Sequence, residues 1–372
     1  MKKTIALILA VGLVMMLFAG CAGTTVVIGE CTCPLNGHTL DEIIAEIPAD
    51  DTPVEENPVV APAEGAVKTG LAVITDISGS TAATAEAAGA AKYDITIAAV
   101  TVDDAGVITA CAIDSVPATI NFDATGAITS DLTAEIRTKD EQGADYGMVA
   151  WGGAIAEWDE QIAAVANYAV GKTIDELKNG DIDMTTGYAK DGTDLQSSAT
   201  INLFSYIFAV EAAVANAQHL GAQAGDELVL VTLNDASSSS AATAEAAGTA
   251  QLDSNIAVVT SKDGVITSCI IDAVQAKIGF DATGAITTDL TAPVATKNEL
   301  GENYGMVAWG GAIAEWNEQA ASFAAYVTGK TADEVAGIAI TETTKPADGT
   351  DLASSVTISI GGFLALIAKA MQ

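Results

Sequence analysis

The sequence predicts an α+β protein built as a tandem duplication of one small domain, in which helices pack on a curved antiparallel sheet. Residues 146–158 recur without a change as residues 304–316. In each copy, apolar residues first alternate with period two around glycine-containing turns and then follow helical spacing. The repeat is too long for a solenoid unit and suits two domains, which we place at residues 71–220 and 221–372.

Composition permits two cores and limits the partners. The chain has 372 residues, 50% of them hydrophobic, so two domains of ordinary size can each bury a core. The formal net charge is -34, and Arg137 is the one arginine. Such a surface repels phosphodiester backbones, which argues against nucleic acid as a partner.

Residues 1–20 have the pattern of a lipoprotein signal peptide. Lys2 and Lys3 precede an apolar run at residues 5–18, which is short for a membrane span. A plain signal peptide cut after a small residue is one interpretation. The Ala-Gly-Cys21 sequence instead resembles a bacterial lipobox, which implies lipidation of Cys21 and an extracytoplasmic protein anchored to the cell membrane.

Residues 21–70 are predicted to form an acidic, proline-rich tether, because four prolines stand among acids between residues 47 and 68. Cys31 and Cys33, with His38 nearby, have half the ligands of a metal site. No second cysteine pair follows, so a local disulfide or two unpaired thiols accounts for them, and no metal site is predicted.

The first elements of each copy are expected to be a short helix and a hairpin. An Ala-rich segment closed by glycine, at residues 84–89 and 243–248, predicts the helix. Alternating apolar residues at 95–99, a turn at 103–106 and an apolar run from 107 predict two strands. A further strand is expected at 118–122. Cys111 and Cys269 occupy matching strand positions, where a small buried side chain explains them.

The later elements are expected to be helical. Thr173 and Thr331 each stand three residues before a glutamate, which is a capping box for a short helix. Long apolar helices are predicted at residues 197–217 and 354–371. An apolar stripe at helical spacing, ending near Gly171, comprises Ile155, Trp158, Ile162, Val165 and Tyr168.

A short hydroxyl-rich motif begins each of the long apolar helices predicted at 197–217 and 354–371. It reads Asp-Leu-Gln-Ser-Ser-Ala-Thr at 194–200 and Asp-Leu-Ala-Ser-Ser-Val-Thr at 351–357. Small hydroxyl residues at a helix start supply N-caps, and the free amides there favour a phosphate. Capping alone is the alternative interpretation.

The element order around this motif resembles the FMN-binding domain family. That family includes the C subunit of the sodium-pumping NADH:quinone oxidoreductase, the related Rnf subunit, and two-domain flavin lipoproteins of extracellular electron transfer. Its motif Asp-x-x-Ser-Gly-Ala-Thr carries FMN as a phosphoester on the final threonine, which implies attachment at Thr200 and Thr357. The other motif positions implied to bind the cofactor are Asp194, Ser197, Ser198, Ala199, Asp351, Ser354, Ser355 and Val356.

Two departures from the family motif bear on this resemblance, which covers roughly residues 90–217 and 250–372. The motif glycine is Ser198 in one copy and Ser355 in the other, and the motif alanine is Val356 in the second. A side chain at the glycine position can obstruct a flavin transferase or a phosphate. The turns at 123–129 and 281–287 also contain Thr-Gly-Ala, but isoleucine stands where the acceptor threonine belongs, so we interpret them as turns between strands.

Other duplicated residues leave two interpretations open. The aromatic and methionine side chains of 146–158 and 304–316 either form core or pack against a flavin ring, and core is the prediction. Lys139 and Lys297 either offset a phosphate or lie on a solvated face, and the solvated face is the prediction. His38 and His219 do not match between the copies, so no shared histidine catalysis and no catalytic residues are predicted.

The resemblance implies a surface-anchored lipoprotein that relays electrons through FMN on two domains, rather than an enzyme with its own substrate turnover. Its partners would be a flavin transferase, a membrane electron donor and an extracellular acceptor. The alternative is a non-catalytic binding or structural lipoprotein that retains the scaffold without covalent flavin. Reversible capture of free flavin is a third hypothesis.

Overall fold

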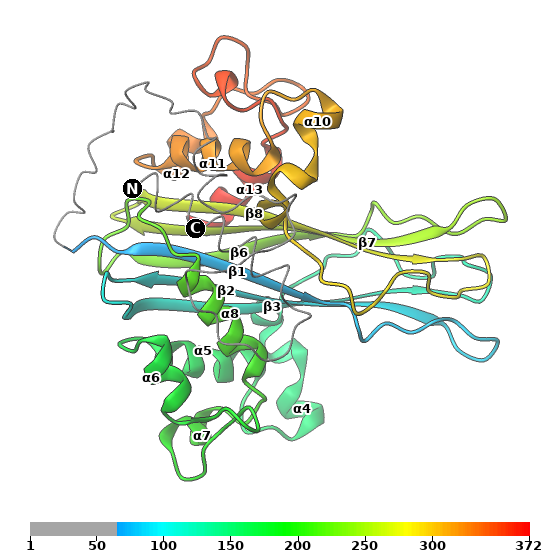
Figure 1. The fold of residues 1–372 in the computed structure, drawn as a ribbon, viewed down its shortest axis with the longest axis horizontal. Helices are drawn as coiled ribbons and strands as arrows, with labels where there is room; N and C mark the ends of the chain where they lie inside the picture. Colours follow the sequence, from blue (N-terminus) through cyan, green and yellow to red (C-terminus); the bar gives the residue numbers. More distant parts are fainter. Residues whose placement is uncertain (1–64) are drawn as a thin grey trace, which may run out of the picture. The chain divides into compact units, whose positions relative to one another are not determined.

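The computed structural model describes residues 65–372, all of which belong to one compact unit (Figure 1). The predicted signal peptide, the predicted lipidation site Cys21, the cysteines Cys31 and Cys33, and most of the predicted tether lie outside the described residues. Within the described part, helices and antiparallel sheets occur together, so the α+β class is confirmed.

The first half contains a three-stranded antiparallel sheet in the order β1-β2-β3. Its strands are β1 (Lys68–Asp76), β2 (Gly89–Val102) and β3 (Ile108–Phe122). The predicted hairpin is β2–β3, and the strand expected at 118–122 is the continuation of β3. The third strand is β1, which begins inside the predicted tether because Leu71 and Val73 bury their side chains in the core.

The second half repeats this arrangement, in the order β6-β7-β8. Its strands are β6 (Glu227–Asp235), β7 (Gly248–Lys262) and β8 (Val265–Phe280). The register is equivalent: Gly89 pairs with Phe122 at the end of one hairpin, and Gly248 pairs with Phe280 at the end of the other.

Short helices follow each sheet. In the first half they are α3 (Lys139–Gln142), the 3-10 turn η1 (Gly143–Tyr146), α4 (Met148–Gly152), α5 (Trp158–Ala169), α6 (Ile174–Asn179), α7 (Asp194–Ser198) and α8 (Phe204–Ala215), with the two-residue strands β4 (Ile182–Asp183) and β5 (Tyr188–Ala189) between α6 and α7. In the second half they are α9 (Lys297–Leu300), η2 (Gly301–Tyr304), α10 (Met306–Gly310), α11 (Trp316–Val327), α12 (Ala332–Ala336), η3 (Leu352–Ser354) and α13 (Gly361–Ala370).

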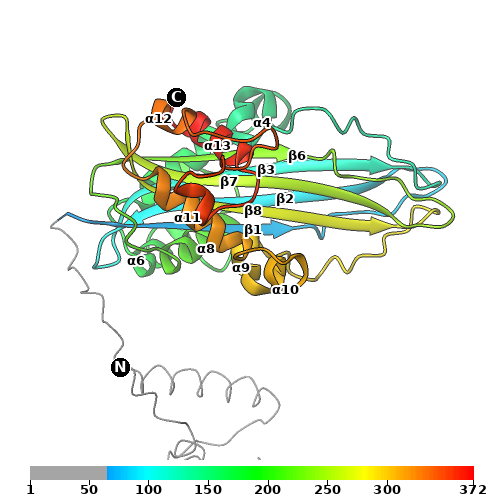
Figure 2. The same ribbon diagram turned by 90° about the horizontal axis from the view of Figure 1, so that it is seen from above.

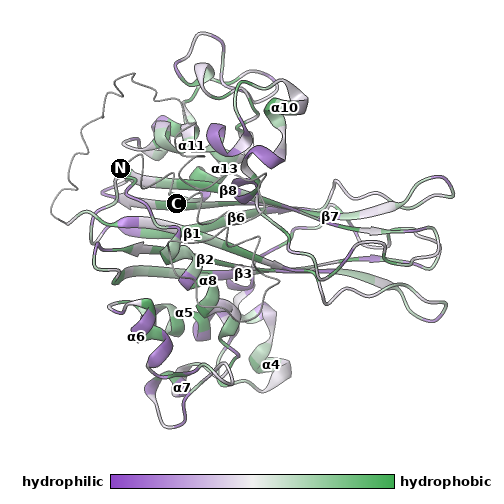
Figure 3. Cartoon of the chain, in the orientation of Figure 1, coloured by the Kyte–Doolittle hydropathy of each residue, from purple (hydrophilic) through white to green (hydrophobic). Residues whose placement is uncertain are grey.

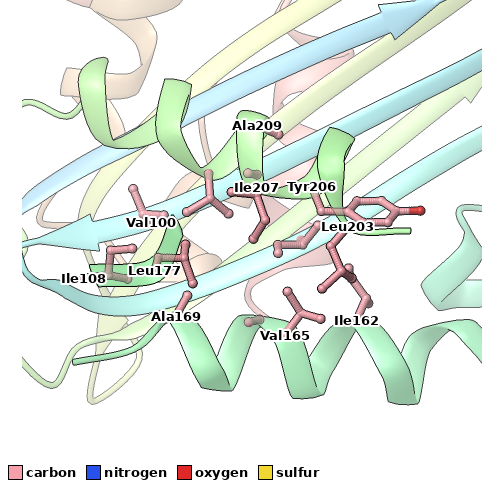
Figure 4. Packing of buried hydrophobic residues seen from close by; sticks show 14 of the residues in the cluster. Val100, Ile108, Ile162, Val165, Ala169, Leu177, Leu203, Tyr206, Ile207 and Ala209 are labelled. Carbon is pink, nitrogen blue, oxygen red and sulfur yellow. The ribbon is translucent and has the colours of Figure 1, made fainter. Parts of the chain in front are cut away.

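The layers are helix, sheet, sheet, helix (Figure 1). Figure 2 looks onto these layers, with α11 and α13 in front of the strands. Helices α5 and α8 bury one core against the outer face of the first sheet, as the packing around Ile162, Val165 and Ile207 in Figure 4 illustrates. Helices α11 and α13 form the matching core on the second sheet. The hydropathy colouring of Figure 3 shows apolar residues along the strands and on these helices.

The inner faces of the two sheets share a third core. Phe122 stacks on Phe280 with ring centroids 4.2 Å apart, and the buried Tyr93 hydroxyl donates to the Ala250 carbonyl at 2.8 Å. The predicted boundary at 220/221 does not separate two independent domains. The structure instead makes the two halves sides of one sandwich, because each sheet is apolar on both faces and covers only one of them with its own helices.

Reciprocal turns fasten the two halves at one end of the sandwich. The amide of Ala242 donates to the Gly126 carbonyl at 2.8 Å, and the amide of Ala83 donates to the Gly284 carbonyl at 2.9 Å. The interpretation of these Asp-Ala-Thr-Gly segments as turns is confirmed, since Asp123 accepts from the amides of the turn that follows it. The glycines also provide the space for this approach.

Three helix predictions are confirmed, and four are wrong, namely those at 84–89, 243–248, 197–217 and 354–371. The predicted stripe forms α5 from Trp158 onward, whereas Ile155 lies before the helix and is exposed. Capping boxes at Thr173 and Thr331 begin α6 and α12. The segment 84–89 is not a helix: the Thr84 hydroxyl accepts the amides of the next residues, and so short an Ala run cannot nucleate a helix.

The predicted long helix at 197–217 is also wrong, because the chain breaks between α7 and α8. Ala199 is extended, and the side chain of Asn202 accepts the amide of Phe204 where α8 begins. The second copy breaks in the same place, between η3 and α13. Thr200 and Thr357 therefore lie in connecting segments rather than in helices.

Candidate functional site

The Thr200 peptide is fixed by a buried glutamine of α5. Its amide donates to Gln161 Oε1 at 2.8 Å, and its hydroxyl oxygen lies 3.3 Å from the same atom. Gln161 is fully buried, and its Nε2 donates to the Ala156 carbonyl at 2.8 Å. A buried amide group whose hydrogen bonds are satisfied holds one orientation. Thr200 itself is exposed, so its hydroxyl is positioned at the surface.

The second half builds the same site. The Thr357 amide donates to Gln319 Oε1 at 2.8 Å, its hydroxyl lies 3.3 Å away, and Gln319 Nε2 donates to the Ala314 carbonyl at 2.8 Å. Gln319 is fully buried, and Thr357 is half-buried. Thr200 and Thr357 thus have equivalent surroundings. Each contacts a glutamine that is not part of the motif.

A glutamate at the start of α5 attaches α4 next to this site. Glu157 Oε2 accepts the Met148 amide at 2.8 Å, and Oε1 accepts the Val149 amide at 3.1 Å. Glu315 receives the equivalent amides in the second half, at 2.8 and 2.9 Å. Glu157 and Gln161 are four residues apart on α5, hence on one face and about 6 Å apart along the axis. This face therefore holds both α4 and the Thr200 segment.

The repeated short helix presents a tryptophan to solvent. Trp151 and Trp309 are each 87% exposed, whereas Trp158 and Trp316 are 2% and 6% exposed. The core prediction is confirmed for the second pair and wrong for the first. The reason is that α4 and α10 are five-residue helices held by their first turn, with the ring of Trp151 lying over Gly147 rather than over the sheet.

Lys139 and Lys297 do not lie on a solvated face. Lys139 is 7% exposed, with Nζ 5.6 Å from the ring centroid of Tyr146 and 5.4 Å from that of Trp158. The Lys297 ammonium is 5.0 and 4.9 Å from the equivalent rings. The prediction was wrong because cation–π contacts and, for Lys139, Asp94 at 3.6 Å stabilise the charge inside the protein.

The other motif residues complete the turn before each threonine. The hydroxyls of Ser197 and Ser198 donate to the Asp194 carbonyl at 2.6 and 3.4 Å, so they close the end of α7. In the second copy Ser354 donates to the Asp351 carbonyl at 2.7 Å. The expected helix N-terminus with free amides is therefore wrong at both motifs, because the chain is leaving a helical turn there.

The positions that depart from the family motif carry no backbone strain. Among residues 65–372, the non-glycine residues with positive φ are Asp263 and Thr344, so Ser198 and Ser355 replace glycine without a strained conformation. Ala199 and Val356 are fully buried, which makes this motif position part of the core. The larger valine fills the core beside α13.

The carboxylates of Asp114 and Asp272 were not among the residues predicted from the sequence. Burial raises the pKa of Asp114 and of Asp272 from 3.8 to about 6, while backbone amides donate to both. Each aspartate accepts an amide of the following short helix, from Asp140 or Asn298. The signal was present, since both stand at the same position of the duplicated strand.

The remaining candidates are structural in the described part of the chain. Cys269 is buried, and burial raises the pKa of its thiol and that of Cys111 to about 12, as expected for core residues. His219 pairs with Asp104 at 3.0 Å. Across residues 65–372 there is no cluster of three potential metal ligands, and no helix there is long and apolar enough to cross a membrane.

The chain matches no protein-family model, no curated protein and no solved structure.

Proposed function

We propose that this protein is a surface-anchored lipoprotein that relays electrons through FMN attached to Thr200 and Thr357. The observation that supports the proposal is the repeated arrangement of a motif threonine fixed by a fully buried glutamine, Gln161 or Gln319. Positioning a surface hydroxyl in the same way twice is what two equivalent attachment points require.

The residues present fit an attached group at these hydroxyls. Thr200 is exposed, so its side chain is accessible to a transferase. The exposed indole of Trp151 lies on the helix that Glu157 attaches to the same face of α5. Aromatic side chains of this kind pack well against planar rings.

The protein's own groups would hold and space the cofactor. FMN supplies the electron-transfer chemistry when bound. Thr200 and Thr357 would provide the attachment oxygens, Gln161 and Gln319 would keep those oxygens fixed, and the shared inner core would keep the two sites at a constant separation. A membrane donor, an extracellular acceptor and a flavin transferase are the partners this function requires, with the predicted lipid at Cys21 as the anchor.

A non-catalytic binding or structural lipoprotein is the second candidate. The observation that favours it is the pair of serines at the motif glycine: Ser198 is exposed directly beside Thr200, where a transferase would have to approach. The exposed Trp151 and Trp309 would then serve a binding surface instead of a flavin.

Flavin fluorescence of the denatured protein separates these candidates. The chain is expressed in exported form with a flavin transferase, beside Thr200→Ala, Thr357→Ala and the double variant. We expect a fluorescent band that loses about half its intensity in each single variant and all of it in the double variant. Thr133→Ala, at an exposed turn, is the matched control and should remain fully fluorescent.

A dark wild-type band, beside a flavinylated control protein that fluoresces, would contradict covalent attachment and favour the binding or structural role. FMN that is released into the supernatant on denaturation would instead support reversible capture.

A further inference from the structure

A cleft of about 720 Å³ lies where the first half meets the second, and its lining includes neither Thr200 nor Thr357. One wall is β1 at Leu71 to Val73 together with the segment that follows α8. The other wall comes from β8, α9 and α11. Its lining combines apolar side chains such as Leu71 and Ile271 with the polar groups of Asp272, Glu299 and Asn317.

The equivalent junction on the opposite edge of the sandwich is occupied by a lysine. Lys369 of α13 donates through Nζ to the Thr232 carbonyl of β6 at 2.8 Å. The same ammonium pairs with Oε1 of Glu141 on α3. This contact joins the two halves. It also pairs the Glu141 carboxylate with a cation, in a protein whose net charge is -34.

The register of the sheets identifies the corresponding atoms in the cleft. Thr232 pairs with Ile256 opposite Asp272, and Val73 pairs with Ile97 opposite Asp114, so Val73 is the counterpart of Thr232. Glu299 is the counterpart of Glu141, because each accepts the amide of its N-cap threonine through Oε2, at 2.8 Å.

The position equivalent to the lysine is an alanine. Tyr206 of α8 packs edge-on against Trp158 at 5.8 Å, and Phe363 of α13 packs edge-on against Trp316 at 5.7 Å, which aligns the two helices. Lys369 is six residues after Phe363, and six residues after Tyr206 stands Ala212. The cleft therefore has the acceptors of the lysine site without its ammonium.

We propose that this cleft binds an organic ligand carrying an aliphatic primary ammonium group. The ammonium takes the position of Lys369 Nζ, between Oε1 of Glu299 and the carbonyl of Val73. The methylene chain lies along the apolar lining of the cleft.

A further acceptor in the cleft supports a ligand that donates hydrogen bonds. The side-chain oxygen Oδ1 of Asn317 is buried and has no hydrogen-bond partner among the described residues, as is also true of Oδ1 of its counterpart Asp159. An unsatisfied buried acceptor is costly, and a second ammonium or an amide N–H of the ligand would remove that cost. A cleft of this size accommodates such a molecule, since small-molecule sites span about 300–1,000 Å³.

Calorimetric titration of the full chain with 1,5-diaminopentane tests the proposal, with 1-pentanol as the uncharged control. We expect one diamine per chain and no heat from 1-pentanol. Glu299→Gln should weaken binding about tenfold or more, because a hydrogen bond to a charged partner is lost. Gln keeps the capping box, so this variant remains folded.

Two variants distinguish the cleft from general attraction to an acidic surface. Glu141→Gln removes the same charge at the lysine junction and should leave the affinity for the diamine unchanged. Ala212→Lys places a tethered ammonium in the cleft and should abolish binding while raising the melting temperature. Equal weakening by both glutamate variants, undiminished binding by Ala212→Lys, or no binding by the wild type would each overturn the proposal.

Discussion

Adding one methyl group at Gly126 tests the contact between the two halves. Gly126 has φ +74°, and a Cβ there would lie 2.6 Å from the Cβ of Ala242 and 2.9 Å from the carbonyl oxygen of Asp281, both in the other half. The left-handed conformation costs a non-glycine residue about 1–2 kcal/mol, and overpacking adds about 1–3 kcal/mol. We expect Gly126→Ala to lower the free energy of unfolding by about 2–5 kcal/mol.

Gly106 supplies the matched control. It has φ +83° in the turn between β2 and β3, and nothing lies within 4 Å of an added Cβ. Gly106→Ala should therefore lower the free energy of unfolding only by the cost of the left-handed conformation, about 1–2 kcal/mol. Urea unfolding gives the loss of unfolding free energy in each variant. The difference between the two losses is the contribution of packing between the halves. Equal losses in the two variants would refute the account of a shared, close-packed contact.

Three further predictions follow from burial and charge. Trp158→Ala should cost about 3–5 kcal/mol of stability by thermal or urea unfolding, whereas Trp151→Ala should change it by less than about 0.5 kcal/mol, since one ring is buried and the other is in solvent. Tyr93→Phe should cost about 1–2 kcal/mol, because the Ala250 carbonyl loses its buried donor; an unchanged unfolding midpoint would contradict that hydrogen bond. Burial raises the pKa of Asp272 from 3.8 to about 6, so its stabilising contribution is complete below about pH 4 and is lost as the pH rises through about 6. Between about pH 4 and pH 7 the wild type should lose about 2 kcal/mol more stability than Asp272→Asn, and parallel pH profiles would show that the carboxyl titrates normally.

The sequence predicted the elements that depend on interactions between residues close together in the chain. The β2–β3 hairpin follows from alternation around a glycine turn, and the capping boxes at Thr173 and Thr331 satisfy their own helix starts. The position of β1 was missed because the burial of its residues depends on the second sheet. The same holds for the broken helix after Ser198, where a glutamine from α5, distant in the sequence, takes the Thr200 amide.

The candidate site could be predicted only in part for the same reason. The motif identified Thr200 and Thr357, but it does not contain Gln161, Gln319, Glu157 or Glu315, which act across the fold. Exact repetition of residues 146–158 pointed to a constraint, and hydrophobicity alone assigned Trp151 to the core. Because α4 is attached only through its first turn, its later residue Trp151 lies in solvent. Residue types alone do not indicate such an attachment.

The inner core made by both sheets has a consequence for folding during synthesis. The sheet β1–β3 is complete once about 125 residues have emerged, yet Phe122 and Tyr93 have no partner until β6–β8 are made. At 5–20 residues per second, translation of the next 150 or so residues takes roughly 8–30 s. For that interval one apolar sheet face is open to water or to a neighbouring chain. Docking of the second half, a contact between residues far apart in sequence, is therefore the step at which we expect the newly made protein to be most prone to association with other copies of itself.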